Sequence, residues 1–133
     1  MKRFGLSRDE RIKSRKDFEN IYSVGRSLIS VDKKIKLFYL LEKQSEQPGV
    51  KIAVAVGKKF GTAVWRNRFK RIIKNSFRLN KASLLNLCLH KKYLLKLVFS
   101  PLQINEKNNK KIYQGDVLSG VLEVLRKIEN VLG

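Results

Sequence analysis

The chain has 133 residues, of which 43% are hydrophobic, so we expect one domain with a packed core and exclude wholesale disorder. Thirty Lys and Arg against eleven Asp and Glu give a formal charge of +19 at pH 7. Such a charge restricts the partners more than the fold: nucleic acid comes first, then an anionic membrane surface, then acidic proteins.

Residues 1–13 are predicted to form a basic, flexible arm, and no apolar run follows them. We therefore expect neither a signal peptide nor a membrane anchor. The single cysteine allows no internal disulfide, which suits a reducing cytoplasm, so we expect a cytoplasmic protein. The first helix is predicted to begin after Ser14, because Ser14 and Asp17 have the spacing of a capping box. In such a box Asp17 reaches back to the Ser14 amide. Gly25 is the expected end of this helix.

Two or three strands are predicted next, and two of them have a clear pattern. The run KKIKLFYLL, residues 33–41, alternates between an apolar face and a mixed face. The mixed face carries Lys36, Phe38 and Leu40. After a turn signal at residues 46–49, the run VKIAVAVG is the clearest strand of the chain. Its second face, with Lys51, Ala53 and Ala55, has small residues that would let another element approach closely.

The run GTAVWRNRFKRIIKNSFR, residues 61–78, predicts a two-faced helix with Thr62 as its N-cap. One side collects Trp65, Phe69, Ile72, Ile73 and Ser76. The opposite side and its flanks carry Arg66, Asn67, Arg68, Lys70, Arg71, Lys74 and Arg78. Between Glu46 and Glu106 there are thirteen Lys and Arg and no acidic residue. Adjacent like charges on a helix cost about 0.2–0.5 kcal/mol per pair, so this face is predicted to bind phosphates.

The leucine-rich residues 80–92 either continue that helix or form a second short one. A further strand is predicted over Tyr93–Phe99, followed by a polar connector over residues 102–113. A final helix begins near Gln114. Its expected core-facing residues are Leu118, Val121, Leu122, Leu125, Ile128 and Leu132. This order of elements predicts a compact α+β sandwich.

Side chains suited to catalysis are few. His90 has no placed acid or nucleophile, and we interpret it as a structural or surface residue. No His, Cys and Asp cluster has metal-ligand spacing, so no metal site is assignable. Cys88 lies among leucines and is expected to be a buried, inert thiol. Phe18 and Tyr22, one helical turn apart, have two open interpretations: core residues, or stacking platforms for unpaired nucleotides.

A resemblance now connects these features. The run VGKKFGTAVWRNRFKRIIKNSF resembles the RNR signature of the protein subunit of bacterial ribonuclease P. The segment KDFENIYSVGRS is similar to the first helix of that family, and the final amphipathic helix falls where the family has one. The resemblance covers nearly the whole chain. It implies one domain with an α-β-β-β-α-β-α order, a ribosomal protein S5 domain 2-like sandwich whose crossover around the RNR helix is left-handed.

The resemblance also implies an activity, the removal of the 5′ leader from precursor tRNA. The catalyst would be the RNA subunit with its bound divalent ions, chiefly Mg²⁺. The implied partners are this RNA and precursor tRNA, with no membrane and no obligate protein partner. When the motif positions of the family are transferred to this sequence, the residues that bind the RNA subunit would be Lys58, Lys59, Arg66, Asn67, Arg68, Lys70, Arg71, Lys74 and Arg78. The cleft that holds the leader would be lined by Phe18, Tyr22, Lys36, Phe38, Lys51, Ala53 and Ala55.

Three positions depart from the family pattern. Lys74 stands where arginine is common, the strand before Pro101 ends without the usual basic residue, and the connector is expanded. Two other classes of protein are alternatives to this interpretation. A ribosomal or architectural RNA-binding protein would share the charge but does not require the complete RNR run. A self-sufficient nuclease would need carboxylate or histidine constellations that the sequence lacks.

Overall fold

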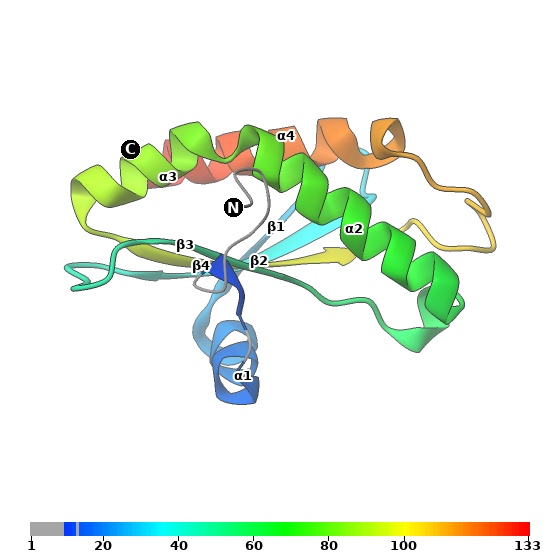
Figure 1. Ribbon diagram of the computed structural model, residues 1–133, viewed down its shortest axis with the longest axis horizontal. Helices are drawn as coiled ribbons and strands as arrows, with labels where there is room; N and C mark the ends of the chain where they lie inside the picture. The colour runs from blue at the N-terminus through cyan, green and yellow to red at the C-terminus, as the bar shows by residue number, and fades with distance from the viewer. Residues whose placement is uncertain (1–9, 13) are drawn as a thin grey trace, which may run out of the picture.

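A four-stranded sheet with helices on both faces organises the computed structural model, which describes residues 10–12 and 14–133 (Figure 1). The elements of the first half are α1 Arg15–Val24, β1 Arg26–Ile29, β2 Ile35–Glu42, β3 Gly49–Val54 and the 3-10 turn η2 Lys58–Phe60. Those of the second half are α2 Ala63–Asn80, α3 Ala82–Lys91, β4 Leu94–Pro101 and α4 Gln114–Leu132. The predicted α+β class and the order of its elements are confirmed, with α3 as an additional short helix.

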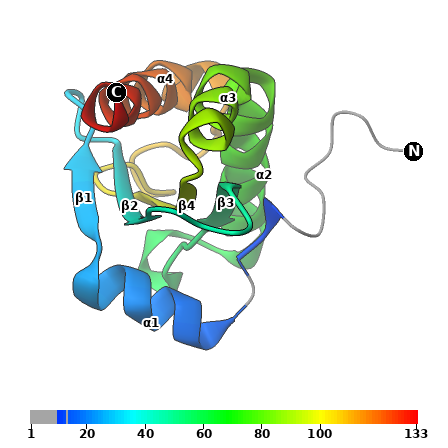
Figure 2. The same ribbon diagram turned by 90° about the vertical axis from the view of Figure 1, so that its left-hand side faces the viewer.

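The strand order across the sheet is β1-β2-β4-β3. The β1–β2 and β2–β4 pairs are antiparallel, whereas β3 and β4 are parallel, with Ala53 opposite Val98. In Figure 2, β3 and β4 run away from the viewer, β4 lies to the left of β3, and α2 and α3 lie above them. The chain passes from β3 over the top to β4, which makes the crossover left-handed, the rare alternative to the usual right-handed connection.

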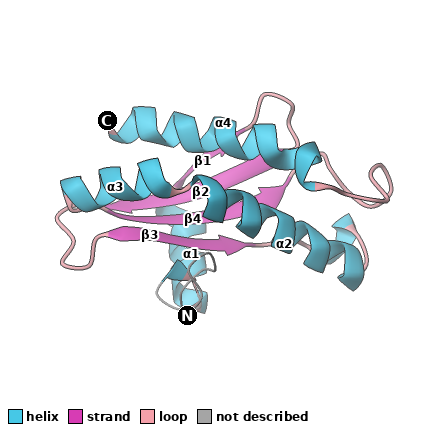
Figure 3. Cartoon of the chain, turned by 45° about the horizontal axis from the view of Figure 1, so that its top comes forward, coloured by secondary structure: helices cyan, strands magenta, loops and turns pink. Residues whose placement is uncertain are grey.

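The helices α2, α3 and α4 cover one face of the sheet, and α1 lies alone on the other (Figure 3). The larger core therefore lies between the sheet and the three-helix layer. A second, smaller core beneath α1 consists of Ile12, Ile21, Ala53 and Val98. Because α1 buries so little, its position depends more on polar contacts than that of the other helices does. None of the described helices is long and apolar enough to cross a bilayer.

The two-faced helix follows its predicted design. Thr62 caps α2, because its Oγ1 accepts a hydrogen bond from the Trp65 amide at 3.3 Å. Trp65 and Phe69 stack with ring centroids 5.6 Å apart and enter the core with the rest of the predicted apolar side. The helix ends at Asn80, and α3 begins at Ala82, which decides the ambiguity of residues 80–92 in favour of a second helix.

Three local details differ from the sequence analysis. The segment Arg26–Ile29, for which no pattern predicted a strand, forms β1 by pairing with β2. The Ser14 hydroxyl accepts from the Asp17 amide at 3.4 Å, but the Asp17 carboxylate turns to Lys96 instead of closing the capping box. The buried face of α4 is also rotated relative to the prediction: Leu118 and Leu122 are only half-buried.

The rotation of α4 has a packing cause. Val117, Gly120 and Val124 face the core together with the predicted Val121 and Leu125. A Cβ at Gly120 would lie 3.3 Å from Ile35 Cγ1, tighter than an ordinary contact, so glycine lets the helix approach β2 this closely without a shift of Ile35. Close contact at Gly120 turns Leu118 and Leu122 towards the rim of the core.

The end of the predicted N-terminal arm adds to the sheet. Arg11 forms a parallel bridge with Ile52, and the Ile12 amide donates to the Ile52 carbonyl at 3.0 Å. Ile12 is consequently buried in the second core. The prediction of a flexible arm otherwise concerns residues 1–9 and 13, which lie outside the described residues.

A candidate RNA interface with two surfaces

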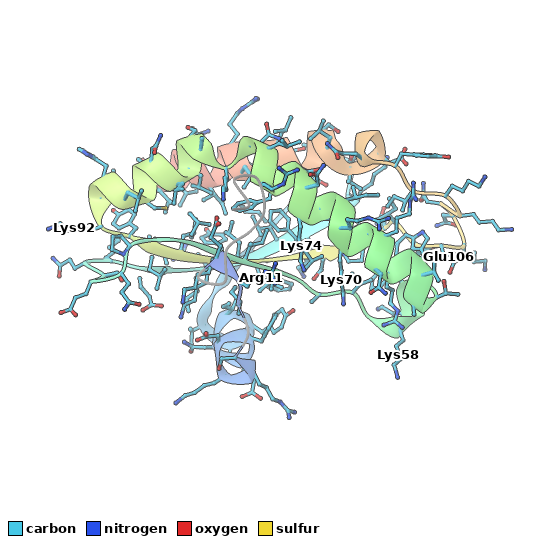
Figure 4. All side chains as sticks on the ribbon, in the orientation of Figure 1. Arg11, Lys58, Lys70, Lys74, Lys92 and Glu106 are labelled. Atoms are coloured by element: carbon cyan, nitrogen blue, oxygen red, sulfur yellow. The ribbon has the colours of Figure 1, made fainter. Side chains whose placement is uncertain are left out.

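The outer side of α2 forms the first surface. We call Arg66, Asn67, Lys70, Arg71, Lys74 and Arg78 the cationic face. Asn67 and Arg71 are exposed and the other four are half-buried, and Figure 4 shows Lys70 and Lys74 on the side of α2 nearer to Arg11. The structure thus brings these predicted residues together along one helix. Lys58 and Lys59 are exposed on η2, immediately before α2.

Most charges of this surface have no acidic partner among the residues that the structure describes. Within residues 10–12 and 14–133, no carboxylate forms an ion pair with the lysines and arginines at positions 58, 59, 66, 70, 71 and 74. A shallow hollow of about 390 Å³ lies along the helix, and Arg11 from the N-terminal segment contributes to its lining. Its other lining residues are Asn67, Lys70, Arg71, Lys74, Asn75 and Arg78.

The positive charges within the hollow affect the ionisation of Lys74. Burial lowers the pKa of Lys74, and the neighbouring charges of Arg11 and Lys70 lower it further. The protein therefore folds with a concentration of positive charge that destabilises its own ammonium group. Bound phosphates would relieve this repulsion, since they supply the missing negative charge.

Two arginines of the predicted set make contacts within the protein. The Arg66 Nε donates to the Gly61 carbonyl at 3.2 Å. The Arg68 Nε donates to the Ile112 carbonyl at 2.6 Å, and its guanidinium lies 5.4 Å from the centre of the Tyr113 ring. Arg68 is thus turned towards the connector, away from the row formed by the cationic face. Its contact with RNA stays a prediction.

The connector supplies a residue that sequence reasoning missed. Glu106 Oε1 accepts from the Thr62 amide at 2.7 Å, and Oε2 lies 3.4 Å from the Thr62 hydroxyl. The carboxylate therefore sits at the N-terminus of α2, where the helix dipole favours negative charge. The signal in the sequence was its position as the first acid after the acid-free interval that begins at Glu46.

The second surface lies on the opposite side of the sheet, beside α1. The Tyr22 and Phe38 rings meet edge to face with centroids 4.8 Å apart, and Lys36 Nζ lies 4.8 Å from the Phe38 ring centre. We call Tyr22, Lys36 and Phe38 the aromatic corner. Tyr22 is 44% exposed, and Phe18 is half-buried one helical turn before it. Burial raises the pKa of Tyr22, although a hydrogen bond with Ser100 opposes the shift.

Part of the predicted cleft is closed. Ala53 is only 8% exposed because it packs in the second core, in which Ile12 also lies. The small-residue face of β3 does admit another element, as predicted, and that element is the N-terminal segment. The prediction that Ala53 lines an open cleft is therefore wrong for this structure. Lys51 and Ala55 are half-buried at either side of Ala53.

A lysine inside the cleft was also missed. Lys96 lies on the α1 side of β4, with Nζ 2.9 Å from Glu42 and 3.3 Å from Asp17. Burial alone would lower the pKa of Lys96, but the hydrogen bonds and charges of Glu42 and Asp17 outweigh it and raise the pKa. A lysine within the apolar run YLLKLVF was the signal, since a charge in such a strand requires partners.

The remaining reactive side chains agree with the sequence analysis in their placement. Cys88 is fully buried, and burial raises the pKa of its thiol to about 11. His90 is exposed at the end of α3. Among the described residues, no three His, Cys, Asp or Glu side chains are grouped so that they could hold a metal ion.

Comparison with known proteins gives consistent results. The family model described as Ribonuclease P matches residues 6–116. The ribonuclease P protein component of Syntrophus aciditrophicus is 36% identical over 81 residues, 61% of this chain and 64% of the relative, so the chain spans less than two thirds of that relative. The protein component of Petrotoga mobilis is 30% identical over 124 residues, 93% of this chain and 95% of the relative.

Solved structures agree with these relatives. The Staphylococcus aureus RNase P protein is 25% identical, with a TM-score of 0.68 over 93% of this chain and 98% of that chain. The RNase P protein from Thermotoga maritima shares the fold, with a TM-score of 0.67 and 23% identity. The match covers 89% of this chain and 96% of that chain. By its family match, its relatives and its fold, the chain belongs to the ribonuclease P protein component family.

Proposed function

We propose that the chain acts as the protein subunit of ribonuclease P, which binds the catalytic RNA subunit and the 5′ leader of precursor tRNA. In this role it assists the endonucleolytic removal of the leader. The observation that carries the proposal is the pairing of two unlike surfaces on opposite sides of one sheet, the cationic face and the aromatic corner. Membership of the family supports the same role.

The cationic face is suited to the folded RNA subunit. Arginine forks bind phosphate oxygens in pairs, and a straight helix presents them at regular spacing to an RNA backbone. Because no described carboxylate forms an ion pair with Arg66, Lys70, Arg71 or Lys74, binding through these four residues need not break ion pairs first. Affinity should fall steeply with salt as condensed counterions are released from the RNA.

The aromatic corner is suited to the leader, which is single-stranded. Exposed rings beside a cation stack on unpaired bases with little sequence preference, and each stack contributes about 1–3 kcal/mol. Tyr22, Lys36 and Phe38 offer this combination next to Phe18. In the proposed complex Mg²⁺ supplies metal-ion catalysis and is bound chiefly by RNA, while this chain binds and orients the two RNAs.

Reconstitution tests the proposal. Precursor tRNA with Mg²⁺ is incubated with the protein alone, with a ribonuclease P RNA alone at low Mg²⁺, and with both. Cleavage at the mature 5′ end that is strongest in the combined sample supports the proposal. Cleavage by the protein alone would identify a self-sufficient nuclease. Binding of RNA without any effect on cleavage would identify an architectural RNA-binding protein.

A further inference from the structure

The connector, residues 102–113, is held firmly although it has no helix or strand of its own. Ile104 and Ile112, near its two ends, are fully buried in the larger core. Between them, the Asn105 carbonyl and side chain accept from the Asn109 and Asn108 amides at 2.7 and 2.9 Å. The connector thus has a defined shape fixed at both ends.

Four further contacts fasten the connector to α2 and η2. The Glu106 amide donates to the Phe60 carbonyl at 2.7 Å, and its carboxylate accepts from Thr62. The Trp65 indole Nε1 donates to the Asn109 carbonyl at 2.9 Å, and Arg68 donates to the Ile112 carbonyl. The connector therefore lies against the start of α2, where Figure 4 shows Glu106 close to the helix and Lys58 below it.

This fixed segment is cationic on its outer side. Lys107, Lys110 and Lys111 are all exposed, and the only acid of the connector, Glu106, has its carboxylate occupied by Thr62. Lys107 and Lys110 share a hollow of about 660 Å³ with Lys59 of η2. The hollow is also lined by Phe60, Gly61, Thr62, Asn105 and Glu106.

We propose, on the basis of the function proposed above, that the connector is a second docking surface for the phosphate backbone of the RNA subunit. Lys107 and Lys110 would contact phosphates together with Lys59, which extends the surface of the cationic face beyond the N-terminus of α2. The RNA subunit is the expected occupant because the connector is joined to α2 and η2, whereas the aromatic corner lies on the other side of the sheet. A fixed loop also loses less conformational entropy on binding than a mobile one.

Glu106 is then a positioning residue. Its charge opposes RNA binding directly, but its hydrogen bonds to Thr62 hold the lysines beside the helix. A purely electrostatic role and a positioning role therefore predict opposite effects of its removal. Removal of the charge alone would strengthen RNA binding, whereas release of the connector would weaken it.

The first experiment measures binding of the full chain to ribonuclease P RNA by filter retention between 50 and 200 mM salt. The test variant carries Lys107→Gln with Lys110→Gln. The matched control carries Lys43→Gln with Lys92→Gln, two exposed lysines at the opposite end of the molecule, where Figure 4 shows Lys92. Each lost phosphate contact lowers the slope of log affinity against log salt by about 0.7–0.9.

We expect the slope of the test variant to fall by about 1.5, and that of the control to stay within error of the unmodified chain. An unchanged slope in the test variant, or an equal fall in the control, would overturn the inference. A third variant, Arg66→Ala with Arg71→Ala, separates this failure from failure of the proposed function. If that variant also binds normally, the function proposed for the cationic face fails as well.

The second experiment compares Glu106→Ala with Glu106→Gln. We expect Glu106→Ala to bind the RNA more weakly although it loses a negative charge, and Glu106→Gln to recover part of the loss because its amide oxygen still accepts from Thr62. Thermal unfolding of both variants identifies any global loss of folding. Equal or tighter binding by a folded Glu106→Ala variant would contradict the positioning role.

Discussion

The Lys96 ammonium lies 3.3 Å from a carboxylate oxygen of Asp17, and this pair joins β4 to α1 across the smaller face of the sheet. The Lys96 side chain is only 11% exposed, and Glu42 is its second partner at 2.9 Å. Because the core beneath α1 is small, this ion pair helps to set the position of the helix. The geometry of the aromatic corner depends on that position, since Tyr22 belongs to α1 and Phe38 to β2.

We predict that the two partners of Lys96 are coupled. Asp17→Asn leaves Glu42 in place and should lower the free energy of unfolding by about 1 kcal/mol. The double variant with Glu42→Gln leaves a nearly buried ammonium unpaired and should cost about 3–5 kcal/mol. Urea unfolding at pH 7 measures both. Glu19→Gln, which breaks an exposed pair with Arg15, is the control and should change stability by less than about 0.5 kcal/mol. Strict additivity of the Asp17 and Glu42 changes would contradict the prediction.

The aromatic corner should govern discrimination between precursor and mature tRNA. Phe18→Ala or Tyr22→Ala should weaken binding of precursor tRNA by the reconstituted complex about fivefold or more, with little effect on mature tRNA, because only the precursor carries a leader to stack. Tyr22→Phe keeps the ring and should retain discrimination. Val24→Ala changes an exposed apolar residue of the same helix and serves as the control. Equal losses for both tRNAs would argue against leader binding here.

Substitutions of Arg71 and Arg68 should differ in their effects on RNA binding and on stability. Arg71 is exposed on the cationic face, so Arg71→Ala should lower the salt slope of RNA binding by about 0.7–0.9 without reducing stability. Arg68→Ala also removes the hydrogen bond to the Ile112 carbonyl and should cost about 1 kcal/mol of stability. Salt titrations and urea unfolding test the two effects, with the exposed Arg126→Ala as the control. Equal stability of both variants would count against the structural role of Arg68.

Anions should stabilise the free protein. Sulfate or phosphate that binds only the folded cationic face shifts the folding equilibrium by mass action, so either should raise the Tm above its value in chloride at equal ionic strength. Burial lowers the pKa of Lys74, and repulsion from Arg11 and Lys70 lowers it further. Lys74→Gln should therefore raise the Tm in chloride and reduce the gain from sulfate, whereas Lys43→Gln should do neither. Identical melting curves in the two salts would refute the prediction.

Cys88 should make stability depend on pH in the alkaline range. Burial raises the pKa of its thiol from about 9 to about 11, so the stabilisation is complete below pH 9 and is lost as the pH rises through 11. The Cys88→Ala variant lacks this contribution, so its loss of stability between pH 9 and 11 should be smaller by about 2 kcal/mol. Urea unfolding across that range isolates the thiol from the lysines common to both proteins. Parallel pH profiles would show that the thiolate is tolerated in the fold.

How much the sequence could predict depended on the range of the interactions. The cap at Thr62 and the two faces of α2 follow from contacts within a few residues, and the structure confirms them. The strand β1 could not be found in this way, because RSLI has no strong pattern and forms a strand only by pairing with residues 36–39. Asp17 shows the same limit: its sequence neighbours favoured a capping box, whereas a lysine 79 residues away became its partner.

Sequence alone determined that an acid-free cationic helix stands between a strand of small residues and a leucine-rich segment, because charge and periodicity are properties of the chain itself. Tertiary structure alone decided that Ile12 covers Ala53, that Lys96 holds α1, and that Glu106 fastens the connector to Thr62. Each of these contacts joins residues distant along the chain. Their formation depends on where the sheet and its crossover place the chain, and local propensity does not encode that placement.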